Sequence, residues 1–492
     1  MTDARFEVVV IVSLESSAAR VMAMADRLRG WQQSGAHVAV YAVAAAIPAL
    51  HALRDFADVQ PLDEWRYAAT SHSVRLLLSD RLAADATVPA LRWSLIPMGQ
   101  PSNEWAPAWR AGLPDADNPQ HRALLSEFWR FFNAAEWQAD GVAARLRDEA
   151  RRAGGIGIYG RGMVGRISRA RAAAAGIRTL FWVDSNPAAR GTNDDGLPVH
   201  TPDDAPDGPV VLAAGAADRM FAAWSAAGRS NAYGLSTLHL AARVAAEPEL
   251  AWQDDAMARP GQYLALMGAL DGDASLRVLE GVLHFRRTLN DRELWAIKSS
   301  HEQWFDPDYF DAALIRSLVD CGGFDGDTAR AFLRHVPDGE VVVIEPDEAL
   351  ATKAAASLSG ARATVIRAAA GAAPGSTWFA KADGMSGALG SADDGVSVEV
   401  PVVRVDDCLS AVAQMIKIDV EGQEAASLAG SRETLRHTPF VAIAAYHRAG
   451  DLTDLPAWLQ LHGAGAIGLR HYTGLAYETV AYTTRATPLG EQ

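Results

Sequence analysis

Residues 318–328 read Leu-Val-Asp-Cys-Gly-Gly-Phe-Asp-Gly-Asp-Thr, and this stretch decides how the last third of the chain folds. An apolar strand ends at Asp320, and a glycine-rich turn follows it directly. Apolar residues at Ala329, Phe332 and Val336 then recur at the spacing of one helical face. Because glycine lacks a Cβ, the backbone of the turn can pass close to a ligand. The pattern predicts a strand–turn–helix unit with a ligand site at the turn.

A second strand, Val341–Ile344, ends in another acid, Glu345. Glu345 lies about 20 residues beyond the turn, where a doubly wound fold places the carboxylate that binds a ribose. Pro346 is expected to begin a helix with Asp347 and Glu348 in its first turn. The turn has neither a phosphate-loop Gly-Lys-Ser/Thr nor a Gly-x-Gly-x-x-Gly motif, which favours adenosine over a dinucleotide. The alternative is a tight turn without any ligand.

Two further strands end in polar residues. The segment Met415–Glu424 reads as a strand that closes at Asp419 and Glu421 and then enters a helix. The next strand, Phe440–Ala445, is followed by His447. Open α/β sheets bind ligands beyond the carboxyl ends of their strands, so these side chains are candidates for a shared site.

Strands and helices alternate along the whole chain. This alternation predicts a multidomain α/β protein with Rossmann-like parallel sheets. Expected strands include Val8–Ser13, His37–Val43 and Thr179–Val183, and a helix is expected at Ser17–Gly30. The predicted domains are an N-terminal α/β domain at 1–105, a helical connector at 106–152, a Rossmann-like domain at 153–245, a second helical connector at 246–310 and a C-terminal domain at 311–492.

The middle domain carries a Gly-x-Gly-x-x-Gly motif at Gly160, Gly162 and Gly165, after a strand and at the start of a helix. Asp184 ends the next strand. The segment resembles small Rossmann-like domains of sugar-modifying acyltransferases and C-methyltransferases, which implies a second site for a nucleotide or nucleotide-sugar. NAD binding and a purely structural role are the alternatives.

Composition narrows the class of protein. The formal net charge of -15 argues against a nucleic acid partner, because an acidic surface repels phosphates. Two cysteines without a Cys-x-x-Cys motif argue against a disulfide framework or a structural zinc site. The N-terminus lacks the features of a signal peptide, and no apolar tract is long enough to span a bilayer. We expect a cytoplasmic protein without membrane insertion, and the sequence leaves open whether it forms a homo-oligomer.

The C-terminal motifs also carry a family resemblance. The pair Val-Asp-Cys-Gly-Gly-Phe-Asp-Gly-Asp-Thr and Ile-Lys-Ile-Asp-Val-Glu-Gly-Gln-Glu resembles the FkbM-type methyltransferases. The run at 341–348, Val405–Asp407 and the closing Tyr472, Glu478–Thr479 and Tyr482 support the likeness, which extends from about Leu264 to the C-terminus. The first motif departs from the family's commoner Gly-Ala-Asn, because it has Gly-Phe-Asp at 323–325.

The resemblance implies a class I methyltransferase fold and transfer of a methyl group from S-adenosylmethionine to a hydroxyl of a sugar, glycan or natural product. Glu345 would then hold the ribose hydroxyls, and Ala368 or Ala369 would lie near the adenine. On this interpretation Asp320, Glu345 and Asp419 close one pocket. The implied cofactor-binding residues are Asp320, Gly322, Phe324, Gly326, Thr328, Glu345, Ala368 and Ala369.

Methyl transfer to a hydroxyl requires in-line positioning and the loss of one proton. Asp419, Glu421, Tyr446 and His447 are the candidate proton acceptors, and His447 is preferred because its ordinary pKa is near neutrality. The alternative is a structural or substrate-binding histidine. A second scheme uses Mg²⁺ bound by Asp419 and Glu421, with or without His447 as a third ligand, and the metal would activate the hydroxyl. Glu421 could instead cap the helix that follows it.

Two other functions remain open at the level of sequence. The first is a nucleotide-sugar oxidoreductase or epimerase centred on Gly160 in the middle domain. The second is a non-catalytic binding or scaffold protein, which would not bind S-adenosylmethionine.

Overall fold

The computed structural model describes residues 7–12, 37–42, 58–61, 76–79, 140–242, 248–382, 385–389, 397–409, 413–462 and 464–484. The chain divides into two compact units, Met1–Glu136 with Ala256–Ala269, and Trp137–Asp255 with Leu270–Gln492. The expected helix at Ser17–Gly30 and most of the first connector lie outside the described residues. Among the helices that are described, none has the length and apolar character needed to cross a bilayer.

In the first unit the described part is a four-stranded parallel sheet in the order β3-β2-β1-β4, together with α9 (Pro260–Ala269). Its strands are β1 (Glu7–Val12), β2 (His37–Ala42), β3 (Asp58–Pro61) and β4 (Leu76–Ser79). The strands expected at Val8–Ser13 and His37–Val43 are present within one residue at each end.

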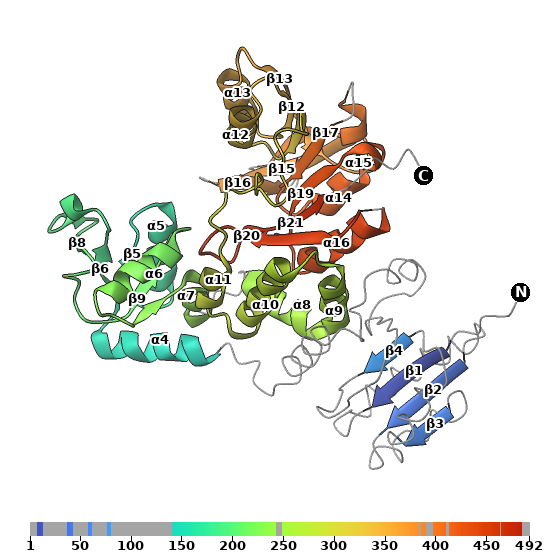
Figure 1. Cartoon of the computed structure of the whole chain (residues 1–492). Coiled ribbons are helices and arrows are strands. Elements are labelled where there is room, and N and C mark those ends of the chain that lie inside the picture. The colour runs from blue at the N-terminus through green and yellow to red at the C-terminus, as the bar shows by residue number, and fades with distance from the viewer. Residues whose placement is uncertain are drawn as a thin grey trace, which may run out of the picture. The chain divides into compact units, whose positions relative to one another are not determined.

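Within the described residues, the second unit contains a middle sheet in the order β10-β9-β5-β6-β8-β7, in which β7 runs antiparallel to β8. Figure 1 labels β5, β6, β8 and β9 of this sheet. Its strands are β5 (Ile156–Tyr159), β6 (Thr179–Val183), β7 (Asn193–Asp194), β8 (Leu197–His200), β9 (Val210–Leu212) and β10 (Ala232–Tyr233). The chain runs from β5 outward to β8 and then returns to β9 on the other side of β5. The strand order therefore reverses between β5 and β9.

Helices cover both faces of the middle sheet. One core cluster joins Trp182 to α4 (Asp140–Ala153), α5 (Met163–Ala174) and α7 (Leu235–Ala241). A second cluster joins the opposite face to α6 (Ala217–Ala226), which contributes the fully buried Trp224. Each face of this sheet is therefore buried, as a parallel sheet requires.

The predicted second connector is helical in the structure. It contains α8 (Pro248–Ala258), α10 (Asp273–Thr288) and α11 (Arg292–Ile297), besides α9. Asp291, which precedes α11, is fully buried, and its carboxylate accepts hydrogen bonds from the Ser236 and Thr237 backbone amides at 3.1 and 3.2 Å. This contact ties the connector to the first turn of α7.

Over the residues that the structure describes, the C-terminal sheet has seven strands in the order β13-β12-β11-β18-β19-β21-β20, and β21 alone runs opposite to the other six. The strands are β11 (Ser317–Cys321), β12 (Glu340–Ile344), β13 (Arg362–Ile366), β18 (Met415–Ile418), β19 (Phe440–Ala444), β20 (Ile467–His471) and β21 (Thr479–Thr484). The multidomain α/β architecture with parallel sheets is therefore confirmed.

The described part of the C-terminal domain has five α-helices: α12 (Asp327–His335), α13 (Glu348–Ser357), α14 (Glu424–Ala429), α15 (Arg432–His437) and α16 (Asp451–Leu461). The helix expected to begin at Pro346 begins two residues later. The reason is that Asp347 is its N-cap, whose carboxylate accepts from the Ala349 and Leu350 amides at 2.8 and 3.0 Å.

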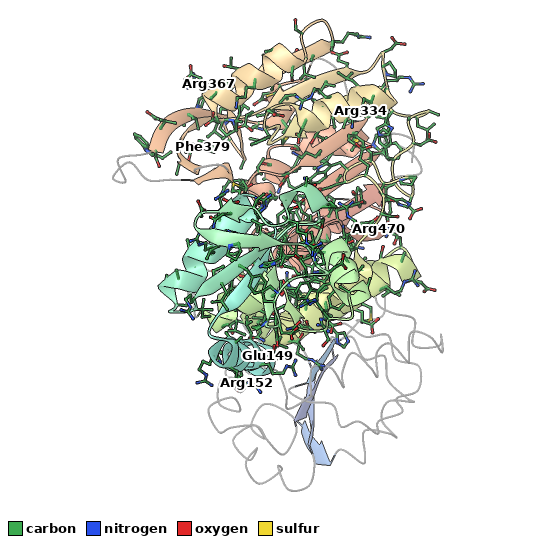
Figure 2. The ribbon with its side chains drawn as sticks, turned by 90° about the vertical axis from the view of Figure 1, so that its left-hand side faces the viewer. Glu149, Arg152, Arg334, Arg367, Phe379 and Arg470 are labelled. Carbon is green, nitrogen blue, oxygen red and sulfur yellow. The ribbon has the colours of Figure 1, made fainter. Side chains whose placement is uncertain are left out.

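A small sheet is inserted between β13 and β18. It has the order β14-β17-β15-β16, with β14 (Ala369–Ala370), β15 (Gly375–Ala382), β16 (Met385–Leu389) and β17 (Ser397–Val403). Figure 2 labels Phe379, which lies on β15. Phe379 is buried and faces the candidate site described next.

Candidate active site

A cavity of about 270 Å³ lies at the carboxyl ends of β11, β12 and β18. The glycine-rich turn, the end of β12 and the residues after β18 line it, together with Gln303 and Trp304 before β11 and Glu478 before β21. The site therefore gathers residues from segments far apart in the sequence onto one edge of the sheet.

The glycine-rich turn packs against the end of β18 too closely for any side chain. Gly322 has φ +76°, and a Cβ on it would lie 1.8 Å from the Asp419 carbonyl oxygen. The next turn residue, Phe324, lines the cavity with φ +49° and remains 38% exposed. The glycine at 322 is therefore required by close packing as well as by the backbone conformation.

Glu345 ends β12 and reaches the cavity, as the sequence predicts. Its Oε2 accepts a hydrogen bond from the Phe324 amide at 2.9 Å, and its Oε1 accepts one from the Asp347 amide at 2.8 Å. Burial raises the pKa of Glu345 to about 7, although these two hydrogen bonds oppose the shift. The carboxylate is thus fixed in direction and stands near its midpoint of ionisation at neutral pH.

Asp320 lies beneath the cavity and does not line it. It is fully buried and forms an ion pair with Lys417 Nζ at 3.0 Å. Lys417 does line the cavity, where Nζ also donates to the Gly322 carbonyl at 2.6 Å and lies 5.3 Å from the Trp304 ring centroid. Burial alone would lower the pKa of Lys417, but the charges of Asp320 and Asp419 raise it overall. Lys417 therefore carries a positive charge.

Asp419 and Glu421 line the cavity, and His447 lies behind them. His447 Nε2 is 3.6 Å from Asp419 Oδ1 and 3.3 Å from Glu421 Oε2, while Nδ1 is 2.8 Å from Glu424 Oε1. Burial would lower the pKa of His447, but Glu424 and the other two carboxylates raise it to about 9. At neutral pH the ring is an imidazolium held among three carboxylates. Tyr446 also contacts this group, because its hydroxyl donates to Asp419 Oδ1 at 3.2 Å.

Glu478 is a cavity residue that sequence reasoning uses only to support the family resemblance. It is the last residue of the loop between β20 and β21, and its Oε2 accepts a hydrogen bond from Gln303 Nε2. Burial and the charge of Asp419 raise the pKa of Glu478 to about 7. Neither Glu478 nor Gln303 ends a parallel strand, so the strand-end rule that finds Glu345 and Asp419 does not find them.

Strained backbone is concentrated around the cavity. Six non-glycine residues of the described chain have positive φ, and four of them line this site: Trp304 (72°), Phe324 (49°), Glu421 (52°) and Glu478 (72°). Such conformations cost about 1–3 kcal/mol each and persist where the surroundings determine them. Their grouping points to the cavity as the candidate site independently of any motif.

The sequence-predicted site residues divide into two groups. Those that line the cavity are Gly322, Phe324, Thr328, Glu345, Ala369, Asp419 and Glu421. Asp320 and His447 lie behind the lining, as described above. Gly326 is the N-cap of α12 and packs against Ala354, and Ala368 is buried with 1% exposed. None of these four residues is among those that line the cavity.

The motif of the middle domain has the predicted backbone form. Gly160 has φ +107°, and a Cβ on Gly165 would lie 1.9 Å from the Gly160 carbonyl oxygen. The Asp184 carboxylate, part of the predicted second site, lies 2.8 Å from Arg161 Nε and accepts a hydrogen bond from the Asn186 amide at 2.9 Å. A nucleotide at this motif would therefore compete with Arg161, and the second site stays a prediction.

Residues 320–465 match the model of the methyltransferase FkbM domain. Among solved structures, a methyltransferase FkbM from Methylobacillus flagellatus is 21% identical, covers 74% of this chain and 99% of its own, and has a TM-score of 0.54. That overlap is longer than the family match, so the shared fold extends beyond the methyltransferase domain.

Two other solved structures overlap only in part. Aeropyrum pernix fibrillarin with bound S-adenosylmethionine is 16% identical over 35% of this chain and 66% of its own, with a TM-score of 0.23. An O-methyltransferase of neocarzinostatin biosynthesis is 17% identical over 43% of this chain and 57% of its own, with a TM-score of 0.22. No curated protein matches the chain. The family match confirms the resemblance seen in the sequence over residues 320–465, which match the methyltransferase FkbM domain, and the Methylobacillus flagellatus protein shares the fold.

Proposed function

We propose that the cavity binds S-adenosylmethionine and that the chain transfers its methyl group to a hydroxyl of a sugar, glycan or natural product. The observation that carries the proposal is the position of Glu345. Its fixed carboxylate lies in one cavity with the glycine-rich turn and with Asp419, as a nucleoside site with an adjoining reaction centre requires.

The strand order gives the ligand a direction. β12 and β13 lie on one side of β11, whereas β18 and β19 lie on the other. Glu345 would accept the ribose hydroxyls, and Ala369 with Phe379 would contact the adenine. The sulfonium end would then extend toward Asp419 and Glu478, where the acceptor must enter.

The charge of the cavity suits this ligand. Among the described lining residues there are five carboxylates, Asp327, Glu345, Asp419, Glu421 and Glu478, and one ammonium, Lys417. S-adenosylmethionine carries two positive groups, the sulfonium and the ammonium, and one carboxylate. An excess of carboxylates therefore favours it over a dinucleotide, whose phosphates would be repelled.

When bound, S-adenosylmethionine would supply an electrophilic methyl group. The acceptor oxygen would form a bond to the methyl carbon as the carbon–sulfur bond breaks, and the hydroxyl proton would pass to a carboxylate. Asp419 lines the cavity and is held by Tyr446, so we assign it this role. His447, the predicted base, would be protonated at neutral pH and would position Asp419 and Glu421.

The predicted Mg²⁺ scheme uses the same three side chains. Asp419 Oδ1 lies 3.6 Å and Glu421 Oε2 lies 3.3 Å from His447 Nε2. Glu424 would orient the imidazole ring through Nδ1. Two carboxylates suit Mg²⁺, but an imidazole suits a transition metal better. The donor set therefore fits Mg²⁺ only in part, and removal of divalent metals with a chelator tests this scheme.

Calorimetry can separate the proposal from the rival nicotinamide enzyme. S-adenosylhomocysteine and NAD⁺ are titrated into the wild type and into Gly162→Trp, a position where a Cβ meets no atom within 4 Å. We expect S-adenosylhomocysteine to bind both proteins equally, because Gly162 lies in the middle domain. NAD⁺ binding that Gly162→Trp abolishes, without any S-adenosylhomocysteine binding, would support the rival and exclude the proposal.

A further inference from the structure

The turn between β9 and α6 lies at the carboxyl edge of the middle sheet. It follows β9, which neighbours β5, so it borders the point where the strand order reverses. In doubly wound sheets this is the place where a ligand binds. Here the turn contacts two segments of the polypeptide that lead into the methyltransferase cavity.

The first segment is the loop at 472–478, between β20 and β21. Its Gly474 amide donates to the Gly215 carbonyl at 2.7 Å. A Cβ on Gly474 would lie 2.8 Å from the Ala217 Cβ, so the two backbones are in close contact. The next residue, Leu475, packs against the core cluster that contains Trp182 of the middle domain. The tip of this loop is therefore seated in the middle domain.

The second segment begins at α11. Trp295 donates through Nε1 to the Gly474 carbonyl at 2.8 Å and packs on Phe221 of α6 with ring centroids 5.1 Å apart. Lys298 Nζ pairs with Asp218 Oδ1 of α6 at 2.6 Å. The first turn of α6 thus holds the end of α11 as well as the loop tip.

Both segments end at the cavity and meet there. From Lys298 the chain continues past Ser299, whose amide donates to the His471 carbonyl at 2.7 Å, to Gln303. The loop continues from Leu475 to Glu478. Gln303 Nε2 donates to Glu478 Oε2, and both side chains line the cavity. The β9–α6 turn of the middle domain therefore contacts both segments, the one that leads to Gln303 and the one that leads to Glu478.

We propose that the β9–α6 turn of the middle domain positions the Gln303–Glu478 pair at the sulfonium end of the methyltransferase cavity, with Leu475 and Lys298 as the positioning residues. The carboxyl edge of the middle sheet thereby serves the methyltransferase site. This inference rests on the proposed function, because it assigns Glu478 to the charged end of S-adenosylmethionine.

The backbone conformation beside Gln303 and at Glu478 indicates that the contacts of the middle domain position these side chains and do not merely hold the two domains together. Trp304, next to Gln303, and Glu478 both have φ +72°. A glutamate or tryptophan adopts this conformation only where surrounding contacts determine it. The Tyr472 amide donates to the Glu478 carbonyl at 3.1 Å, so the two ends of the loop are joined and Glu478 is connected to the tip by only the residues between them.

The test compares S-adenosylmethionine, which is charged at sulfur, with S-adenosylhomocysteine, which is not. The ratio of their dissociation constants, measured by calorimetry at one pH, reports carboxylates near the sulfur and cancels general loss of folded protein. We expect Glu478→Gln to lower the preference for S-adenosylmethionine roughly threefold to tenfold. Leu475→Ala and Lys298→Met should also lower this preference. Leu475→Met, which keeps an apolar side chain of similar size, should leave the preference near that of the wild type.

Leu197→Ala is the matched control, because Leu197 packs against the same core cluster as Leu475 without belonging to the loop. It should leave the ratio unchanged at a similar loss of thermal stability. An unchanged ratio in Leu475→Ala and Lys298→Met, with Glu478→Gln effective, would overturn the positioning role. Failure of both ligands to bind the wild type would instead overturn the proposed function.

Discussion

Glu345 illustrates how a single residue gains a function from its neighbours. Its two carboxylate oxygens are each fixed by a backbone amide, one from the glycine-rich turn and one from the start of α13. Burial nevertheless raises the pKa of Glu345 to about 7. Because the carboxyl group is fixed in direction and its pKa lies near neutral pH, the affinity for a ligand that it binds should depend on pH.

Affinity for S-adenosylhomocysteine should therefore rise with pH. Ribose hydroxyls donate hydrogen bonds, so the ligand prefers ionised Glu345. Below pH 7 the free protein holds a proton on Glu345 that binding must expel, which costs up to about tenfold in affinity per pH unit. Above pH 7 the affinity should level off.

Calorimetry at pH 6, 7 and 8 measures this dependence. The Glu345→Gln variant, which cannot ionise at this position, should bind more weakly and without the rise between pH 6 and 7. A wild type whose affinity does not change across this range would show that Glu345 does not change ionisation on binding.

At the scale of elements, helix α13 connects stability to the cavity. Asp347 caps its N-terminus through the Ala349 and Leu350 amides, and the Asp347 amide in turn holds Glu345. The N-cap Asp347 and the proposed ribose-binding carboxylate of Glu345 are thus two residues apart. Loss of the cap should loosen the backbone that directs Glu345.

We expect Asp347→Ala to lower the free energy of unfolding by about 1 kcal/mol, the usual value of an N-cap. It should also weaken S-adenosylhomocysteine binding, because the Asp347 amide loses its fixed position. Urea unfolding and calorimetry measure the two effects. Glu348→Ala, which removes an exposed carboxylate from the same helix, should change neither by a comparable amount; equal effects in both variants would contradict the capping account.

For the whole molecule, the limits of sequence reasoning follow from the range of the interactions. Glu345 and Asp419 are found from the sequence because each ends a strand, and strand ends are encoded locally. Lys417 lies inside an apolar strand. Its role cannot be predicted locally, because its ion-pair partner Asp320 is about a hundred positions away in the chain. The Gln303–Glu478 pair depends on how two distant segments dock, which no local pattern records.

The same reasoning explains His447. Its ordinary pKa suggests a base, and its position after β19 is predictable from the strand pattern. The structure surrounds it with Asp419, Glu421 and Glu424, whose charges keep the proton on the ring. The electrostatic environment of a residue is a property of the folded site, so the chemical role inferred from residue type alone is incomplete.

The proposed function depends most on a single nucleoside cavity in which Glu345 binds the ribose. Calorimetric titration of S-adenosylhomocysteine into the wild type and Glu345→Ala at pH 8 tests it most directly. We predict binding to the wild type that the substitution weakens by about 1–3 kcal/mol, the cost of leaving hydrogen-bonding groups unpaired. Equal affinity in the two proteins, or no binding to the wild type, would contradict the account.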